Sequence, residues 1–387
     1  MNGSATGTLA CPRPPGAGDT HAHLNAGMHA GTNTSLGADL HGHASTDAAW
    51  QALAAPRLRR LLAAALLLLA CVLADLATGP ALLAPLDVLR ALAGDPVLHG
   101  TRVIVWEIRL PVALMAVAVG AALGLSGVVM QTVLHNPLAS PYTLGISAGA
   151  GFGAALAIVA GSLLPLPPAV AVPLAAFAFA GLGCWAVLRI GRAQGGDAQG
   201  FVLAGIALLF LFQALLSLLQ YLASPEALQQ IVFWLFGSLY KATRAQVGVL
   251  AGVLALCTPW LLAQAWRLTA LQLSDERAAS LGVDVSGLRW RCLAVVSLLT
   301  GTAVAFVGTI GFIGLIAPHI ARAPWGEDHR HLLPGAALCG ALLLSGASVL
   351  GKLISPGALI PIGIVTACLG VPFFLVLVMR KRSEVAW

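Results

Sequence analysis

The sequence predicts an all-α, polytopic membrane protein with ten transmembrane helices and both termini in the cytoplasm. Charged residues make up only 9% of the 387 residues, and 58% are hydrophobic. Soluble domains carry about 25% charged residues, because water must solvate their surfaces. The mean hydropathy is +0.89. A chain with so few charges cannot cover a water-facing surface, so we expect it to be embedded in the lipid bilayer.

The pattern of charge and cysteine excludes further classes. The formal net charge is +6, but no block of basic residues is interleaved with aromatic residues, so nucleic-acid binding is not expected. In a membrane protein a basic excess is typical of cytoplasmic loops. The seven cysteines are scattered singly, and no C-x-x-C or Cys/His spacing predicts a metal site. We expect neither a metal nor a cofactor.

Residues 1–56 differ from the rest and are predicted to form a disordered, His-containing N-terminal extension. They are rich in Gly, Ala, Thr and His and hold five of the ten histidines. They contain no apolar run, so they do not fit a secretory signal, and they have little to bury. Metal buffering by the H-x-H pairs at 21–23 and 41–43 is the alternative. The transmembrane domain is then residues 57–387.

Long charge-free runs supply the transmembrane helices. A transmembrane helix needs about 20 mainly apolar residues. Residues 110–188 contain no Asp, Glu, Lys or Arg over 79 positions, which is room for three helices. Turn-forming sequences at 135–141 and 165–168 divide them. The other charge-free runs are 61–74, 198–225, 245–266, 292–321, 332–351 and 353–379.

The run 292–321 decides the number of crossings. At 30 residues it is long for one helix and short for two, with Gly308 and Gly311 near its middle. With two crossings, 14 Lys and Arg residues lie inside and six outside, leaving out Arg13. With one crossing the distribution is ten and ten. The positive-inside rule therefore favours two crossings, and hence ten helices.

Glycine spacing predicts that some of these helices pack closely. Gly120/Gly124, Gly145/Gly149 and Gly149/Gly153 are all G-x-x-x-G pairs. Such pairs let two helix backbones approach each other within the membrane.

Residues 346–352 match the beginning of a phosphate-binding loop, G-x-x-x-x-G-K. However, Leu353 stands where the Ser or Thr that holds magnesium is required. The stretch also ends a predicted transmembrane helix, with no strand before it. We interpret the match as accidental, so the chain itself is not expected to bind ATP.

The membrane body contains few groups that could do chemistry. No convergent set of His, Cys or carboxylates predicts an enzyme, and we expect His319 to have a packing role. A proton-coupled secondary carrier usually needs a buried Asp, Glu or Lys. The long apolar runs contain almost no such residues, so that class is disfavoured. The body is predicted to be a pathway that supplies no energy of its own.

The hydrophilic segment 267–291 is the longest predicted connection between helices on the cytoplasmic side. Residues 269–282 fit a short helix that ends at Gly282, followed by a second short segment. A long helical loop of this kind suits a docking surface for a cytoplasmic partner, although an ordinary loop is the alternative.

From about residue 57 to 382 the chain resembles the FecCD family, the permease subunits of ABC importers for iron-siderophores, haem and vitamin B12. It is especially similar to the vitamin B12 importer's permease. The matching stretches occur in the family's order and spacing. They are "WEIRLP" (106–111), "GAALGLSGVVMQTVLHNPLASPYTLGISAGAG" (120–151), "RAASLGV" (277–283), "GTIGFIGLIAPHIAR" (308–322), "DHRHLLPG" (328–335) and "PIGIVTACLGVPFFL" (361–375).

The resemblance implies partners and a location. Two permease subunits, here a homodimer, form a pathway across the inner membrane. Two cytoplasmic ATP-binding subunits supply the energy, and a periplasmic substrate-binding protein delivers the ligand. The resemblance implies an iron complex (siderophore or haem) as the substrate, with vitamin B12 as the alternative.

The resemblance also implies roles for three sets of residues. Arg109 and Lys352 match basic positions that dock the binding protein. Asn136, Leu138, Asp197 and Ala198 match the cytoplasmic gate, where Asp197 replaces a small hydroxyl residue. The loop 267–291 matches the segment that couples to the ATPase, through Arg277, Ala278, Ser280, Leu281, Gly282 and Val283.

Overall fold

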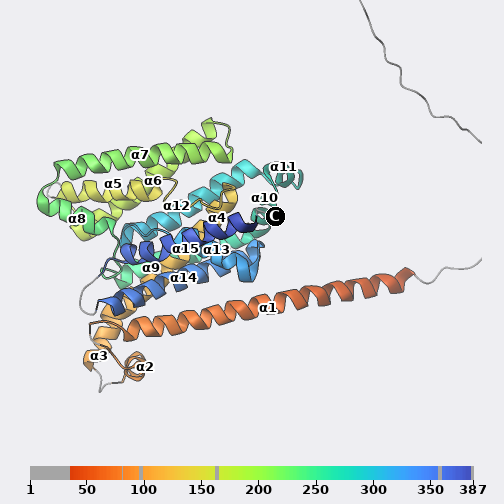
Figure 1. The fold of residues 1–387 in the computed structure, drawn as a ribbon, viewed down its shortest axis with the longest axis horizontal. Coiled ribbons are helices and arrows are strands. Elements are labelled where there is room, and N and C mark those ends of the chain that lie inside the picture. Colours follow the sequence, from red (N-terminus) through yellow and green to blue (C-terminus); the bar gives the residue numbers. More distant parts are fainter. Residues whose placement is uncertain (1–34, 81, 96–98, 162–164, 356–359, 385–387) are drawn as a thin grey trace, which may run out of the picture. The chain divides into compact units, whose positions relative to one another are not determined.

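The computed structural model describes residues 35–80, 82–95, 99–161, 165–355 and 360–384, and the regular structure in these ranges is helical (Figure 1). The chain divides into two units, residues 1–53 and residues 54–387. The first helix, α1 (Ser35–Ala77), begins in the predicted extension. Residues 1–34 lie outside the described residues, so the disorder of the extension stays a prediction. The all-α fold class is confirmed.

The helices that follow α1 are joined mostly by short turns. They are α2 (Pro85–Ala93), α3 (His99–Val103), the π-helical turn η2 (Ile104–Arg109), α4 (Leu110–Val133), α5 (Ile146–Val159), α6 (Pro168–Ala193), α7 (Ala198–Leu222), α8 (Pro225–Leu235), α9 (Arg244–Ala263), α10 (Ala265–Leu271), α11 (Asp275–Ser280), α12 (Val285–Val307), α13 (Ile313–Trp325), α14 (His329–Ile354) and α15 (Ile362–Glu384).

Seven helices in the described part of the chain are long and apolar enough to cross a membrane. They are α1 from Pro56, the continuous stretch Gly100–Val133, and α6, α7, α9, α12 and α14. Two shorter apolar helices cover Ile146–Val159 and Ile362–Val376. The chain is therefore a multi-pass membrane protein. The crossing of all ten predicted segments, and the side that the termini face, stay predictions.

The ambiguous run 292–321 contains two helices, as predicted. α12 ends at Val307 and α13 begins at Ile313. Gly308 lies between them with φ of +77°, a left-handed conformation that glycine adopts without steric penalty. The Val307 carbonyl leaves the helix and accepts a hydrogen bond from Ser238 N at 2.7 Å. This break separates the two helices because the backbone bonds at the end of α12 are redirected.

Helix α4 is the buried centre of the second unit and packs against α12, α13 and α14. The predicted glycine pairs explain how closely some of these helices approach each other. A Cβ at Gly120 or Gly124 would collide with the α14 backbone at Gly340 or Ala336. A Cβ at Gly149 would lie 2.8 Å from the Phe179 carbonyl oxygen of α6. The pairs thus mark two close helix crossings, α4 with α14 and α5 with α6.

Replacing Gly124 with Val should destabilise the subunit by about 1–3 kcal/mol, because the α14 backbone cannot move aside for the added side chain. The matched control is Gly252→Val in α9, where an added Cβ meets no atom within 4 Å. Thermal unfolding of both variants in detergent checks this expectation. Equal midpoints for the two variants would contradict the close crossing.

Candidate functional site

The predicted functional residues fall into two clusters at opposite ends of α4. This helix has 24 residues, so at 1.5 Å per residue its ends lie about 36 Å apart. Arg109 precedes its first residue, and Asn136 follows its last residue by three positions. The predicted docking charges therefore lie at one end of the bundle. The predicted gate and coupling residues lie at the other.

The predicted coupling segment α11 has a helix signal at each of its ends. Ser274 caps its N-terminus by accepting a hydrogen bond from Arg277 N at 3.2 Å. Gly282, with φ of +82°, ends it, as predicted. The Val283 N–H donates to the Ala278 carbonyl, and the Gly282 N–H donates to the Ala279 carbonyl. These two bonds make a Schellman motif, in which glycine is the preferred residue.

The same motif divides the predicted coupling residues into an anchor and a surface. Ala278 and Val283 are buried, which seats α11 on the bundle. The other four residues are exposed, and the Leu281 side chain is 58% exposed. They are Arg277, Ser280, Leu281 and Gly282. An exposed leucine on a short rigid helix at the surface is suited to contact with a partner.

One expectation for this segment was wrong. Residues 269–282 do not form a single helix, because α10 ends at Leu271 and α11 begins at Asp275. The Ser274 cap begins a new helix instead of continuing the old one. The second short segment is the first turn of α12, which Asp284 caps through Gly287 N at 2.9 Å.

The first predicted gate segment is a tight turn after α4. The Asn136 Oδ1 accepts a hydrogen bond from Leu138 N at 2.9 Å, and the Asn136 carbonyl accepts one from Ala139 N at 3.0 Å. Asn favours such side-chain-to-backbone turns. The turn leaves the Leu138 side chain 51% exposed. Asn136 thus shapes the turn, and Leu138 is the side chain that the turn presents.

The second predicted gate segment is the first turn of α7. The Asp197 Oδ1 accepts a hydrogen bond from Gly200 N at 2.9 Å, which makes Asp197 the N-cap of α7. Ala198 follows as the first helical residue and is half-buried. Asp caps helices about as well as Ser, so a carboxylate can replace a hydroxyl here without loss of the cap.

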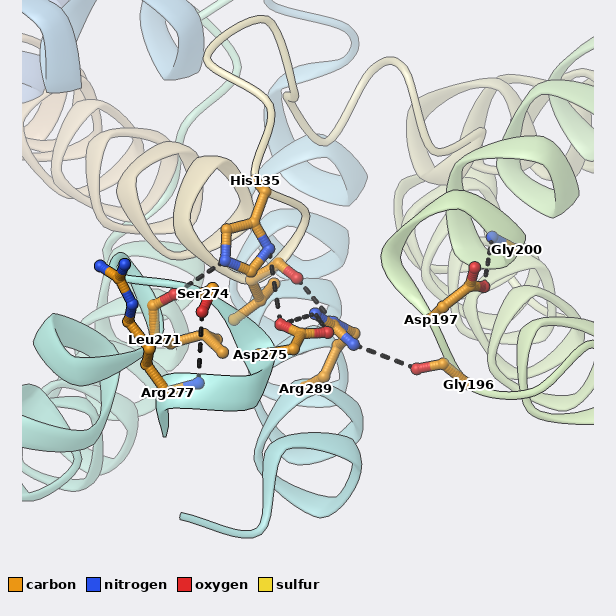
Figure 2. Close-up of polar contacts among 10 residues, drawn as sticks. His135, Gly196, Asp197, Gly200, Leu271, Ser274, Asp275, Arg277 and Arg289 are labelled. Carbon is orange, nitrogen blue, oxygen red and sulfur yellow. Dashed lines mark hydrogen bonds and ion pairs between the residues drawn. The ribbon is translucent and has the colours of Figure 1, made fainter. Parts of the chain in front are cut away.

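Arg289 of α12 brings the three segments together, as Figure 2 shows. Its side chain is only 1% exposed. Its Nε donates to the Val133 carbonyl at 2.6 Å, and its Nη1 donates to the Gly196 carbonyl at 3.1 Å. Its Nη2 lies 2.9 and 3.0 Å from the two carboxylate oxygens of Asp275. Val133 lies three residues before Asn136, Gly196 lies one residue before Asp197, and Asp275 begins α11.

No role is predicted for Arg289 from the sequence, where it is one of the basic residues of the hydrophilic segment 267–291. Its two backbone partners lie 156 and 93 residues away in the sequence, so no local pattern indicates them. The neighbouring Asp275 was read only as part of the loop.

The predicted docking residues are buried against α1. The Lys352 Nζ lies 3.0 Å from the Asp75 Oδ1, and the two side chains are 6% and 0% exposed. Lys352 also donates to the Asp75 carbonyl at 3.1 Å. The Arg109 Nη1 donates to the carbonyls of Leu76 and Ala77 at 2.7 and 3.0 Å. The structure thus places both cations at one end of the bundle, with their side chains directed into it.

Asp75 holds this cluster together. It is completely buried and lies in the last turns of α1. Tyr240 lies in the loop before α9. Burial raises the pKa of its hydroxyl, and the nearby Asp75 carboxylate raises it further. The buried carboxylate is thus paired with Lys352 of α14 and lies near this loop. In the sequence, Asp75 is only the charge that follows the apolar run 61–74.

The phosphate-loop match is accidental on structural grounds as well. Residues 346–352 lie within α14, where backbone N–H groups are used by the helix and cannot cradle a phosphate. Within the described ranges, no group of three or more His, Cys, Asp or Glu residues could hold a metal ion.

Comparison with known proteins identifies the architecture. The family model described as the FecCD transport family matches residues 66–380. The chain belongs to the FecCD transport family. Its curated relatives include the hemin transport system permease protein of Yersinia pestis, which is 41% identical over 286 residues, 72% of this chain and 84% of the relative. The vitamin B12 import system permease protein of Salmonella schwarzengrund is 38% identical over 325 residues, 84% and 95% of the two chains.

Two further relatives of this FecCD permease point the same way. A Helicobacter pylori protein named as an iron chelatin transport system permease is 42% identical over 293 residues, 74% of this chain and 85% of the relative. A solved structure described as an inward-facing metal-chelate type ABC transporter has a TM-score of 0.73 and 33% identity, over 84% of this chain and 99% of the other. The FecCD chain is therefore an ABC transporter permease.

Proposed function

We propose that the chain forms the translocation pathway of an ATP-driven importer for an iron complex, either a siderophore chelate or haem, across the inner membrane. The observation that carries this proposal is the cluster in which Arg289 of α12 bonds to Asp275 of α11 and to the backbone just before both predicted gate segments. A segment that receives force from an ATPase must be joined to the part that opens, and Arg289 joins them. Transport of vitamin B12 is the alternative.

The names of the relatives support this substrate class. A permease named for hemin and one named for iron chelatin are 41% and 42% identical to the chain, against 38% for vitamin B12 permeases. The margin is small, so an uptake assay must decide. Radiolabelled haemin, a ferric hydroxamate chelate and cyanocobalamin are offered in parallel to cells that express the complete importer. We expect ATP-dependent uptake of an iron complex. Exclusive uptake of cyanocobalamin would favour the alternative.

The partners follow from the proposed function. Two copies of the chain assemble around the pathway, two cytoplasmic ATP-binding subunits hydrolyse ATP, and a periplasmic binding protein delivers the substrate. The exposed face of α11, centred on Leu281, contacts the ATP-binding subunit. Asn136, Leu138, Asp197 and Ala198 form the cytoplasmic gate. The chain itself is not an enzyme.

Docking of the binding protein near Arg109 and Lys352 is also part of the proposal. Both side chains are turned inward in the isolated subunit, so their burial does not by itself indicate docking. The support for docking is the family resemblance. Reversing Lys352 to Glu would place two carboxylates side by side, so loss of docking must be separated from loss of folding. A binding titration at two salt concentrations does this when only well-folded protein is used. Docking charges predict weaker binding at higher salt.

A proton-coupled secondary carrier is the less favoured alternative. Asp75 is a buried carboxylate in a membrane-spanning helix, which such a carrier needs. However, it is paired with Lys352 at 3.0 Å. A pair of this kind fits a structural contact between α1 and α14 as well as a proton path. ATP dependence of uptake separates the two functions.

Deleting residues 1–50 should leave uptake largely unchanged, because the compact transmembrane unit begins at residue 54. The measurement is initial uptake of the transported complex by cells with equal amounts of full-length and shortened chain in the membrane. A collapse of uptake at normal insertion would show that the extension takes part in transport.

A further inference from the structure

We propose that Arg289 is a positioning residue that transmits movement of α11 to both gate segments through one buried guanidinium. This inference rests on the proposed function. The inference adds a specific connection to that function, because the proposed roles of the coupling surface and the gate do not explain how one moves the other.

The geometry of Arg289 is unusual for a cytoplasmic arginine. Its side chain is 1% exposed, and its three nitrogens are directed to three different segments. Arginine is suited to this role, since its planar guanidinium offers five donors in a fixed arrangement. Two of the acceptors are main-chain carbonyls, those of Val133 and Gly196. A displacement of the guanidinium therefore acts on the backbone three residues before Asn136 and one residue before Asp197, and not only on side chains.

The link to α11 is the one of the three in which Arg289 faces an opposite charge. Its Nη2 donates to both carboxylate oxygens of Asp275, at 2.9 and 3.0 Å, and the Asp275 side chain is 43% exposed. All three links are charge-assisted, because the guanidinium is the donor in each. Asp275 is the first residue of α11, directly after the Ser274 cap. A shift of α11 is therefore passed to Arg289 through an ion pair, while the exposed face of α11 stays available to a partner.

His135 adds a second connection between the same elements. Its Nε2 lies 2.7 Å from the Leu271 carbonyl of α10, and its Nδ1 lies 3.7 Å from the Asp275 carboxylate (Figure 2). Its φ is +47°, in the left-handed region that a non-glycine residue rarely adopts. Such a conformation persists when surrounding contacts maintain it. The contacts here come from α10 and α11, and His135 is bonded directly to Asn136 of the gate turn.

A pair of matched substitutions tests the connection. Asp275→Asn removes the charge that faces Arg289. Asp284→Asn removes a charge in the same loop, one whose ion-pair partner is Arg291 at 3.2 Å, on α12 itself. Asn also serves as an N-cap, so the Asp284 variant keeps the start of α12. Both variants lose one ion pair, but only the first loses a contact that reaches the gate.

The readout is the nucleotide response of the gate in the assembled complex with its ATP-binding subunit. A single cysteine replaces Leu138 or, separately, Ala198, in a background with Cys11, Cys71 and Cys368 changed to Ala. The rate of labelling by a water-soluble maleimide is measured without nucleotide and with ATP and vanadate. ATP hydrolysis is measured on the same samples, because a misfolded subunit would lose hydrolysis as well.

We expect the nucleotide-dependent change in labelling to fall about tenfold at both positions in Asp275→Asn, within the range seen for residues that carry coupling between sites. Hydrolysis should persist, and Asp284→Asn should keep the parent's response. Arg289→Lys should behave as Asp275→Asn does, since a lysine cannot serve three separate acceptors in this arrangement.

A full response of both positions in Asp275→Asn would overturn the inference. An equal loss of the labelling response in Asp284→Asn would also overturn the inference, because the response would then depend on any ion pair in the loop and not on the contact with Arg289. A parent complex whose gate positions do not respond to nucleotide would overturn the gate assignment and the inference together. ATP-dependent uptake by that same parent complex shows whether the proposed transport function fails with them or stands.

Discussion

Replacing Lys352 with Met should destabilise the folded subunit by about 3–5 kcal/mol, because it leaves the Asp75 carboxylate buried without its cation. Asp75 is 0% exposed, and the Lys352 ammonium lies 3.0 Å from it. The effect is measured by thermal unfolding in detergent, with the fraction of monodisperse protein as the signal. Lys241→Met is the matched control, since Lys241 is exposed. Substitutions at such exposed positions usually change stability by less than about 0.5 kcal/mol.

The double variant Asp75→Leu/Lys352→Met separates the two origins of this effect. Removal of both charges leaves no uncompensated ion, and apolar replacements of buried pairs are often neutral or stabilising. We therefore expect the double variant to be more stable than Lys352→Met alone. A double variant that is less stable than either single variant would show that the pair does not act as a unit.

Gly282→Trp should lower uptake about tenfold while the subunit stays inserted and assembled, because in the proposed function α11 carries force from the ATP-binding subunit. An added Cβ at Gly282 meets no atom of this chain within 4 Å, so a bulky residue there projects away from this chain. The control is Gly282→Ala. Both replacements put a side chain at φ of +82°, which costs about 1–2 kcal/mol, so they differ mainly in bulk.

Uptake and ATP hydrolysis of these two variants are measured in the same membranes. The expected result is that Gly282→Ala transports well and that Gly282→Trp does not, with hydrolysis no longer stimulated by substrate. Equal uptake by both variants would remove α11 from the coupling role. A charged residue in place of the exposed Leu281 should act as Gly282→Trp does.

The sequence contained most of the helical architecture. Charge-free runs located the apolar helices, because a segment that crosses lipid must satisfy its backbone internally and leave charges at its ends. The glycine pairs at 120/124 and 149/153 located two helix crossings, and Gly282 located the end of α11. Each of these signals is local, since it depends on residues within one turn or one helix of each other.

The interior charges could not be predicted in the same way. Lys352 and Asp75 are 277 residues apart, and Arg289 and Val133 are 156 apart. In both cases the sequence showed only a basic residue near the end of an apolar run, which is also the pattern of a solvated loop charge. Burial of these groups depends on packing between distant helices. For the same reason the sequence did not indicate that Arg109 and Lys352, the predicted docking residues, are buried in this subunit.

In the proposed function, this FecCD chain is a pathway whose energy comes from a separate ATP-binding subunit. The most direct measurement is uptake of the transported iron complex into proteoliposomes that hold the chain with its ATP-binding subunit and the substrate-loaded binding protein. We expect uptake with ATP, and none when the ATP-binding subunit is omitted or its nucleotide site is inactivated. Uptake by the chain alone, driven by a proton gradient and indifferent to ATP, would contradict the account.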